Sequence, residues 1–281
     1  MPTFAAYDGT ELACKVLGDG PPLVCLPGGP MQDCSYLGEL GGLSAHRRLI
    51  LADPRGTGGS AVPEDPATYR CDRLVDDVEA LREHLGLDRL DLLAHSAGTN
   101  LAVLYAERHP ERVARLALIT PSPYAVGVEI TGAVRRETAL LRHAEPWFPE
   151  AFAALERIVA GDGDAEAFLA IAPFWYGRWD EDARAHRAAE DAHRNQEAAA
   201  RYGDGAFTPD ATRAALARLS CPVLVLAGEV DLNSPPSAVA EVAAVFPHAE
   251  MVVQPGAGHF PWLDDAEQFV GTTAGFLARQ R

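Results

Sequence analysis

Three residues of this chain have the types needed to activate a serine nucleophile: Ser96, Asp231 and His259, in that order. A serine hydroxyl attacks a carbonyl carbon effectively only when a neighbouring base, most often histidine, removes its proton. The histidine needs a carboxylate on its second ring nitrogen, which fixes the tautomer and stabilises the protonated ring. These residue types therefore predict acyl transfer from a carbonyl compound to Ser96.

The residues around Ser96 form a pattern that is typical of a strand turning sharply into a helix. An apolar run over residues 90–94 breaks at the serine, and apolar residues at helical spacing follow it. Ala94 and Gly98 are small, as is required where the strand and the helix pass close together. A serine at such a turn has a strained backbone conformation that exposes its hydroxyl. The pattern predicts a nucleophile elbow.

Asp231 and His259 each come shortly after a strand-like segment, at residues 223–227 and 250–253. The carboxyl ends of parallel strands meet at one edge of a sheet, so we expect both side chains to reach Ser96 there. Glu229 lies closer to its strand and is the second choice for the acid. His95 is next to the nucleophile but is expected to be structural, because adjacent residues of a tight turn point apart.

The wider sequence predicts an α/β fold, a mainly parallel sheet with helices on both faces, because short apolar strands alternate with amphipathic helices. We predict strands at residues 11–17, 23–26, 49–53, 90–94, 115–119, 223–227 and 250–253. We predict helices at residues 70–85, 99–108, 237–246 and 266–279.

Residues 123–215 differ from the rest because they contain no convincing strand. They consist of helical segments rich in alanine and charge, broken by proline and glycine, and they carry most of the large aromatic residues. We therefore predict a core formed by residues 1–122 and 216–281, with residues 123–215 as a helical cap over the carboxyl edge of the sheet. Aromatic residues of a cap either line a pocket or pack its helices, and the sequence leaves both alternatives open.

Acyl transfer also requires backbone N–H donors placed where negative charge develops on the carbonyl oxygen. One donor is expected at Ala97, directly after the nucleophile, and the other at Gly29 in the loop after residues 23–26. Gly28 and Gly29 let this loop approach the reacting carbon, and we expect Gly28 and Pro30 to contact the substrate. The alternative is an ordinary turn, since Pro-Gly-Gly-Pro forms turns in many contexts.

The composition of the chain limits the kinds of molecule that it is expected to bind. A formal net charge of −16 argues against nucleic-acid binding, which needs a basic face. No apolar stretch approaches the roughly 18 residues of a membrane span. The first residues lack a secretory signal and the five cysteines form no Cys-x-x-Cys pair, so we expect a cytoplasmic protein with reduced thiols. With no metal-ligand cluster, Rossmann glycine pattern or phosphate loop, we expect no metal, no cofactor and a small-molecule substrate.

Three motifs resemble the α/β-hydrolase superfamily and, within it, the prolyl aminopeptidase (proline iminopeptidase) group. Residues 27–31 read Pro-Gly-Gly-Pro-Met, where that group has His-Gly-Gly-Pro-Gly. Residues 53–60 read Asp-Pro-Arg-Gly-Thr-Gly-Gly-Ser, which resembles Asp-Gln-Arg-Gly-x-Gly-x-Ser. Residues 258–262 read Gly-His-Phe-Pro-Trp, which resembles Gly-His-x-Pro-Trp. The resemblance implies the α/β-hydrolase fold, with the helical cap inserted before the last strands.

The elbow departs from that group. Residues 94–98 read Ala-His-Ser-Ala-Gly, which is closer to esterase-like members than to the group's Gly-Gly-Ser-Trp-Gly. In the group, a Trp-Glu pair of the cap helps to hold the free amine of the substrate, and Trp179-Asp180 corresponds to it with a shorter carboxylate. The alternative is that Asp180 starts a helix, because acidic residues are common in a first turn. Trp175, one of the aromatic residues of the cap, and Phe260, directly after His259, are also expected to contact the substrate.

Three hypotheses about function follow. The first is a serine hydrolase of small amides that resembles prolyl aminopeptidases and works through an acyl-enzyme. The second is a hydrolase of carboxylic esters, lactones or thioesters with the same machinery. The third is a non-catalytic, ligand-sensing member of the superfamily, against which a complete triad argues. The sequence does not indicate the oligomeric state.

Overall fold

In a computed structural model, the described part of the protein is residues 2–279, without the side chain of Asp191. These residues form an eight-stranded sheet with the strand order β1-β2-β4-β3-β5-β6-β7-β8. The strands are β1 (Thr3–Ala5), β2 (Glu11–Leu17), β3 (Pro22–Leu26), β4 (Arg48–Ala52), β5 (Leu90–His95), β6 (Val113–Ile119), β7 (Val223–Gly228) and β8 (Ala249–Gln254). The strands from β4 to β8 in this order pair in parallel, whereas β1 and β2 are antiparallel. The predicted mainly parallel α/β sheet is confirmed.

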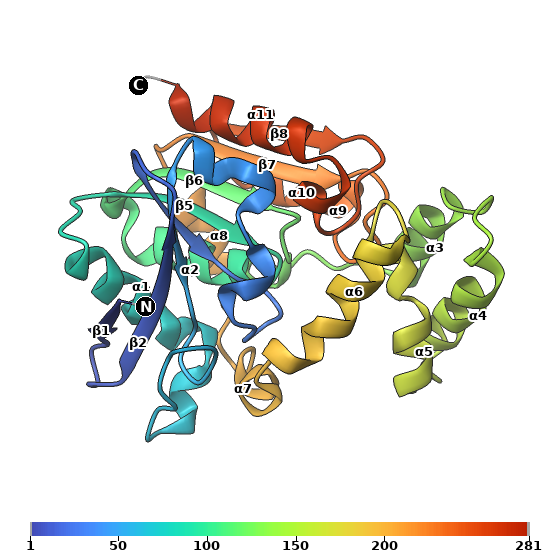
Figure 1. Ribbon diagram of the computed structural model, residues 1–281, viewed down its shortest axis with the longest axis horizontal. Helices are drawn as coiled ribbons and strands as arrows, with labels where there is room; N and C mark the ends of the chain where they lie inside the picture. Colours follow the sequence, from blue (N-terminus) through green and yellow to red (C-terminus); the bar gives the residue numbers. More distant parts are fainter. Residues whose placement is uncertain (1, 280–281) are drawn as a thin grey trace.

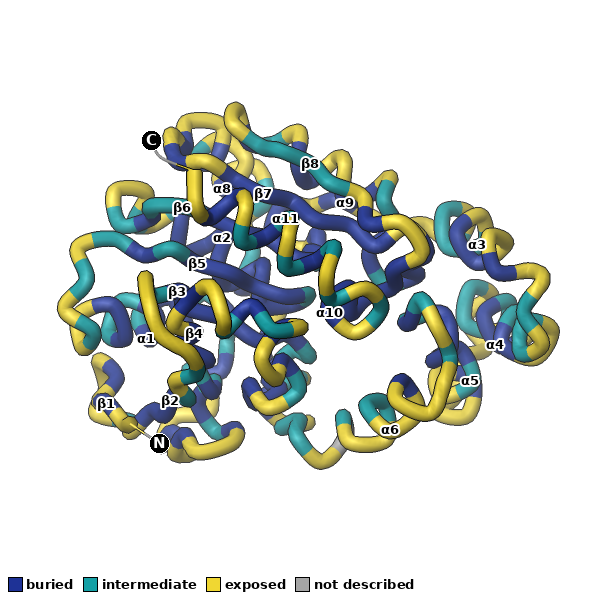
Figure 2. The backbone as a smooth tube through the Cα atoms, turned by 45° about the horizontal axis from the view of Figure 1, so that its top comes forward, coloured by how far each residue is buried: buried dark blue, intermediate teal, exposed yellow. Residues whose placement is uncertain are grey.

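The central strands β3, β5, β6 and β7 are mostly apolar, as expected for strands that are covered by helices on both faces. In β5, successive residues point to opposite sides, so that Leu92 packs in one apolar cluster and Leu93 in the other. Helices α1 (Cys71–His84), α2 (Gly98–Arg108) and α9 (Pro236–Ala243) cover the first face. Helix α11 (Ala266–Ala278) covers the second face, together with a 3₁₀ segment, Leu40–Ala45. Figure 2 shows the buried central strands with these helices around them.

The seven predicted strands and four predicted helices are all present, and no end differs from its predicted position by more than three residues. Strand β1 was not predicted, because three residues are too few to show an alternating pattern. The helix predicted at residues 237–246 ends earlier, at Ala243. None of the helices described in residues 2–279 has the length and apolarity needed to cross a membrane.

The segment between β6 and β7 is helical, as predicted for the cap. Its helices are α3 (Gly132–Leu140), α4 (Phe148–Val159), α5 (Ala165–Ala170), α6 (Glu181–Glu190), α7 (Gln196–Arg201) and α8 (Pro209–Leu216). Helices α3, α4 and α5 share a separate apolar cluster and stand apart from the sheet in Figure 1, where α6 leads back toward it. Helix α8 instead lies on the core, where the Thr212 hydroxyl donates a hydrogen bond to Glu107 of α2.

Candidate active site

Ser96 occupies the sharp turn between β5 and α2. Its φ of 51° is positive, which is rare for a residue other than glycine and is the strain expected of an elbow. Two glycines allow the close packing around it. A Cβ on Gly98 would lie 2.3 Å from the carbonyl oxygen of Pro27, and one on Gly28 would lie 2.8 Å from the Cβ of Ser96. The elbow therefore depends on glycine at both positions.

Ser96, His259 and Asp231 form one line of hydrogen bonds. His259 Nδ1 is 2.8 Å from Asp231 Oδ2, and His259 Nε2 is 2.8 Å from Ser96 Oγ. A carboxylate only accepts, so in the neutral imidazole Nδ1–H donates to Asp231 and Nε2 accepts from the serine hydroxyl. Asp231 is fully buried, and its other oxygen accepts from the Asn233 N–H at 2.8 Å. This is the geometry needed to deprotonate Ser96.

Glu229, the second choice for the acid, lies elsewhere. Its carboxylate accepts from the N–H of Gly256 at 2.7 Å, in the exposed turn before His259. Asp264 is also close to this turn, and its carboxylate accepts from the N–H groups of Gly258 and Gly177. It thereby joins the loop that carries His259 to the helical segment, while Asp265 caps α11.

His95 and Tyr36 connect the glycine-rich loop to the catalytic histidine. His95 Nε2 lies 2.8 Å from the carbonyl oxygen of His259, which only accepts, so Nε2 carries the proton. Nδ1 then accepts from the Tyr36 hydroxyl at 2.7 Å, and that hydroxyl accepts from the Gly28 N–H at 2.6 Å. Burial holds the pKa of His95 well below its usual range, which keeps this ring neutral. His95 is structural, as expected, and Tyr36 was not predicted.

The two expected oxyanion donors belong to the turn that follows Ser96 and to the glycine-rich loop that packs against this turn. The Cβ position of Gly28 is 3.3 Å from the Ala97 nitrogen, so the glycine-rich loop and the residue after Ser96 are in contact. Among the described residues, no protein acceptor takes the N–H of Gly29 or of Ala97. Such donors can serve a carbonyl oxygen bound between the loop and the elbow.

A cavity of about 870 Å³ opens above Ser96 and His259. Its walls include Gly29 of the glycine-rich loop and Phe260, as expected. Trp175 also lines it, and its carbonyl accepts from the His259 N–H at 2.7 Å. Residues of the helical segment between β6 and β7 therefore form part of the pocket wall and also support His259.

The expectation that Trp179 and Asp180 line this pocket is wrong. Asp180 is exposed, and its carboxylate accepts from the Ala183 N–H at 3.0 Å, which makes it the N-cap of α6. It borders a different, smaller cavity, and Trp179 packs against Tyr176. Pro30 does not line the pocket either, and its carbonyl accepts from Arg194 Nε at 3.2 Å. Gly28, in the same loop, does not line the pocket and packs against Ser96 instead.

The sequence analysis missed the charged residues of the pocket. Arg135, Arg187 and Arg194 line it, together with a single carboxylate, Glu190. All four belong to the helical segment between β6 and β7, where charged residues are frequent. Their helical spacing alone does not show which of them face inward, so no local signal distinguishes them.

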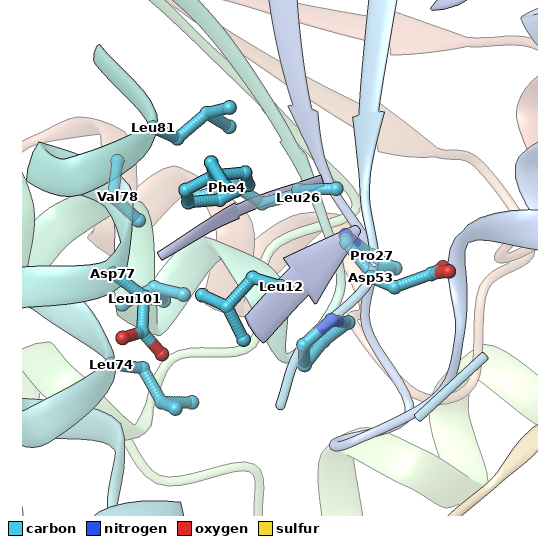
Figure 3. A pocket seen from close by; sticks show the side chains of 12 residues that line it. Phe4, Leu12, Leu26, Pro27, Asp53, Leu74, Asp77, Val78, Leu81 and Leu101 are labelled. Carbon is cyan, nitrogen blue, oxygen red and sulfur yellow. The ribbon is translucent and has the colours of Figure 1, made fainter. Parts of the chain in front are cut away.

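The motif at residues 53–60 has a structural role. The Asp53 carboxylate accepts from the N–H groups of Cys34 and Gly59, and the buried Arg55 pairs with Asp77. A cavity of about 40 Å³ lies beside this motif and α1, and it shares no residue with the active-site pocket. Its walls are apolar except for Asp53 and Asp77 (Figure 3), whose carboxylates already have partners. It is therefore a packing gap rather than a ligand site.

Comparison with known proteins agrees with this geometry. A family model described as the alpha/beta hydrolase fold matches residues 21–266, so the chain belongs to the α/β-hydrolase family. The proline iminopeptidase of Heyndrickxia coagulans is 26% identical over 272 residues, 92% of this chain and 91% of that protein. The proline iminopeptidase of Lactobacillus helveticus is 39% identical over 119 residues, and this match spans 40% of each chain.

Two solved structures have a similar fold over almost the entire chain. The proline iminopeptidase of Mycobacterium smegmatis has a TM-score of 0.73 and 25% identity, with 98% of this chain and 97% of that chain covered. The esterase RhEst1 from Rhodococcus sp. ECU1013 has a TM-score of 0.75 and 25% identity, with 99% and 98% covered. The relatives thus include both a peptidase and an esterase. No cluster of metal-ligating side chains occurs within residues 2–279.

Proposed function

We propose that this protein is a serine hydrolase that forms an acyl-enzyme on Ser96. The observation that carries the proposal is the line of hydrogen bonds from Ser96 Oγ through His259 to the buried Asp231. Ser96 Oγ attacks the carbonyl carbon of the substrate as His259 Nε2 takes its proton, and Asp231 stabilises the resulting imidazolium. The negative oxygen of the tetrahedral intermediate accepts hydrogen bonds from the N–H groups of Gly29 and Ala97.

The second half of the cycle returns the proton. His259 donates it to the leaving group as the bond from the carbonyl carbon breaks, which leaves the acyl group on Ser96. A water molecule, deprotonated by His259, then attacks the acyl carbon and releases the carboxylic acid. Residues 123–215 act as the cap that shapes the pocket for the acyl and leaving groups.

The substrate class that the pocket favours is a carboxylic ester, lactone or thioester. An aminopeptidase must bind a charged N-terminal amine, for which a carboxylate is the natural partner. Asp180, the carboxylate expected in this role, caps α6 outside the pocket. The pocket lining contains three arginines and one glutamate, which disfavours a cation.

Aminopeptidase activity is the second candidate. Glu190 lines the pocket and has the carboxylate that an amine requires. The similar proteins from Heyndrickxia coagulans and Mycobacterium smegmatis are proline iminopeptidases. Against it, Glu190 Oε2 already lies 3.4 Å from Arg187 Nη1. A panel of prolyl and other aminoacyl 4-nitroanilides, run beside short-chain 4-nitrophenyl esters, separates the two activities.

The test of the nucleophile uses a fluorophosphonate probe, which reacts with activated serines. The protein should be labelled once, at Ser96, and Ser96→Ala should lose both the label and turnover, by a factor on the order of 10⁶ in kcat. A circular dichroism melt of Ser96→Ala controls for folding. Labelling that persists in Ser96→Ala, or a folded wild type that takes no label, would refute the catalytic proposal and favour a ligand-sensing protein.

A further inference from the structure

The charge of the active-site pocket is opposite to that of the protein. The chain as a whole has a formal net charge of −16. Among the described side chains, and apart from histidines, the charged residues that line the pocket are three arginines and one glutamate, a formal charge of +2. The glutamate, Glu190, lies 3.4 Å from one of them, Arg187. A long-range field from the whole protein repels anions, so any preference for an anionic substrate must come from these local contacts.

Arg135 of α3 is the clearest of these cations. Its Nη1 donates to the carbonyl oxygen of Leu232 at 2.7 Å, directly after Asp231, and this is its one hydrogen bond among the described residues. None of the described carboxylates lies within ion-pair distance of it. A guanidinium has five N–H donors in one plane, so most of those of Arg135 remain available to a ligand. Burial lowers the pKa of Arg135. The Asp231 carboxylate acts on Arg135 only from beyond ion-pair distance, so an anion in the pocket would supply the direct partner that this side chain lacks among the described residues.

The other two arginines are held against the remaining catalytic loops. The Arg187 guanidinium lies over the Trp175 ring, 5.3 Å from its centroid, and the Trp175 carbonyl holds the His259 N–H. Arg194 donates to the Pro30 carbonyl of the glycine-rich loop. Each arginine is thus anchored beside a different catalytic loop, and the positive charges surround the space above Ser96.

We infer that the substrate carries a carboxylate in addition to its scissile carbonyl, and that Arg135 and Arg187 bind it. The substrate class is an anionic ester, lactone or thioester, such as a half-ester of a dicarboxylic acid. The guanidinium fork matches a carboxylate geometrically, and its charge-assisted hydrogen bonds are strong in a partly buried site. This inference rests on the proposed hydrolase function, and the test below separates the two.

A purely structural role for the arginines makes a different prediction. If Arg135 only holds the loop of Asp231 through Leu232, its removal lowers turnover of every ester by the same factor. If it binds the substrate, only the anionic esters are affected. The ratio of kcat/KM between matched anionic and neutral esters is therefore the informative quantity.

This ratio can be measured with three aryl esters of similar size. 4-Nitrophenyl hemisuccinate has its carboxylate on the acyl side, a 4-carboxyphenyl butyrate has it on the leaving group, and 4-nitrophenyl butyrate is neutral. The wild type should prefer one of the two anionic esters over the neutral one. Which anionic ester is preferred identifies the side of the pocket that the arginines serve.

Arg135→Met and Arg187→Met should each lower kcat/KM for the preferred anionic ester about 10- to 100-fold, because a hydrogen bond to a charged group is lost. The neutral ester should change by less than about threefold. Arg135→Lys should recover part of the loss, since it retains the charge without the fork. Arg136→Met is the matched control for Arg135, because Arg136 pairs with Glu156 instead and does not line the pocket. Arg184→Met serves in the same way for Arg187, because Arg184 lies over Trp179.

A second readout does not depend on turnover. Succinate should slow fluorophosphonate labelling of Ser96 in the wild type and in Arg136→Met, and protect much less in Arg135→Met, with butyramide as the neutral comparison. Equal losses on neutral and anionic esters, or a wild type that prefers the neutral ester and gains no protection from succinate, would overturn the inference while the hydrolase proposal stands. Absence of labelling and of all turnover would instead refute the proposed function.

Discussion

The carboxyl edge of the sheet and the helical segment above it contribute to the pocket in different ways. At the sheet edge, Ser96, Asp231 and His259 each follow a strand and are held by hydrogen bonds of 2.8 Å that are buried or partly buried. In the helical segment, the residues that line the pocket range from the buried Leu155 to the exposed Phe168, and α3 to α5 have a small apolar cluster of their own. The first region fixes reacting atoms, and the second sets the shape and charge of the pocket.

Trp175 is one of the residues that connect the helical segment to the sheet edge. Its carbonyl accepts from the His259 N–H, and its ring packs under Arg187. From this difference we expect that catalysis and substrate selection can be changed separately, although Arg135 and Arg194 of the helical segment also contact the loops at the sheet edge. A change at the sheet edge should lower turnover of all substrates together, whereas a change in the helical segment should alter the preference between them.

Among residues that do not bond to the substrate, we expect the largest loss of kcat when Asp231 is substituted. Asp231→Asn retains the shape but favours the wrong imidazole tautomer, a substitution that costs about 10⁴ in kcat in the well-studied serine proteases. Steady-state kinetics on a neutral ester measures this loss. Glu229→Gln, two residues earlier, should change kcat by less than about threefold, because Glu229 bonds to Gly256 and not to His259. The reverse ranking of the two variants would contradict the assignment of the acid.

A smaller effect is expected at Tyr36, which positions the glycine-rich loop through the Gly28 N–H and the ring of His95. Tyr36→Phe removes both hydrogen bonds without changing the charge. It should lower kcat about 10- to 100-fold, less than the direct loss of an oxyanion donor, with KM little changed. A loss that appears only in KM, or only as a lower melting temperature, would show that Tyr36 does not align the loop.

The smallest effect is expected at Asp180. Asp180→Ala removes the N-cap of α6, which costs about 1 kcal/mol and should lower the melting temperature by about 2–4 °C. Turnover of aminoacyl anilides and of esters should change by less than about twofold, because the side chain lies outside the pocket. A selective loss on aminoacyl substrates would restore Asp180 as an amine-binding residue and weaken the contrast between the two regions.

The sequence predicted the sheet edge well because its signals are local. The small residues around Ser96 and the strand-like runs before Asp231 and His259 are each readable within about ten residues. Tyr36 could not be predicted, because its role depends on contact with His95, 59 positions away. The pairing of β3 with β5 brings these segments together, and no local pattern encodes it.

For residues 123–215, the sequence predicted that the segment is helical but not which side chains face the pocket. Its helices follow from composition and punctuation, but the face that each one turns toward the pocket depends on packing between helices. Asp180 was wrongly placed for this reason, since an acid that begins a helix has the same local sequence whether it faces the pocket or the solvent. Arg135 was overlooked because its partner, Leu232, is 97 positions away.

The most direct test of the contrast compares two variants on two substrates. The kcat/KM ratio of the preferred anionic ester to 4-nitrophenyl butyrate is measured for the wild type, Tyr36→Phe and Arg135→Met. Tyr36→Phe should lower both values by the same factor and leave the ratio unchanged, whereas Arg135→Met should lower the ratio about 10- to 100-fold. A ratio that shifts in Tyr36→Phe, or one that stays constant in Arg135→Met, would contradict the separation of catalysis at the sheet edge from selection in the cap.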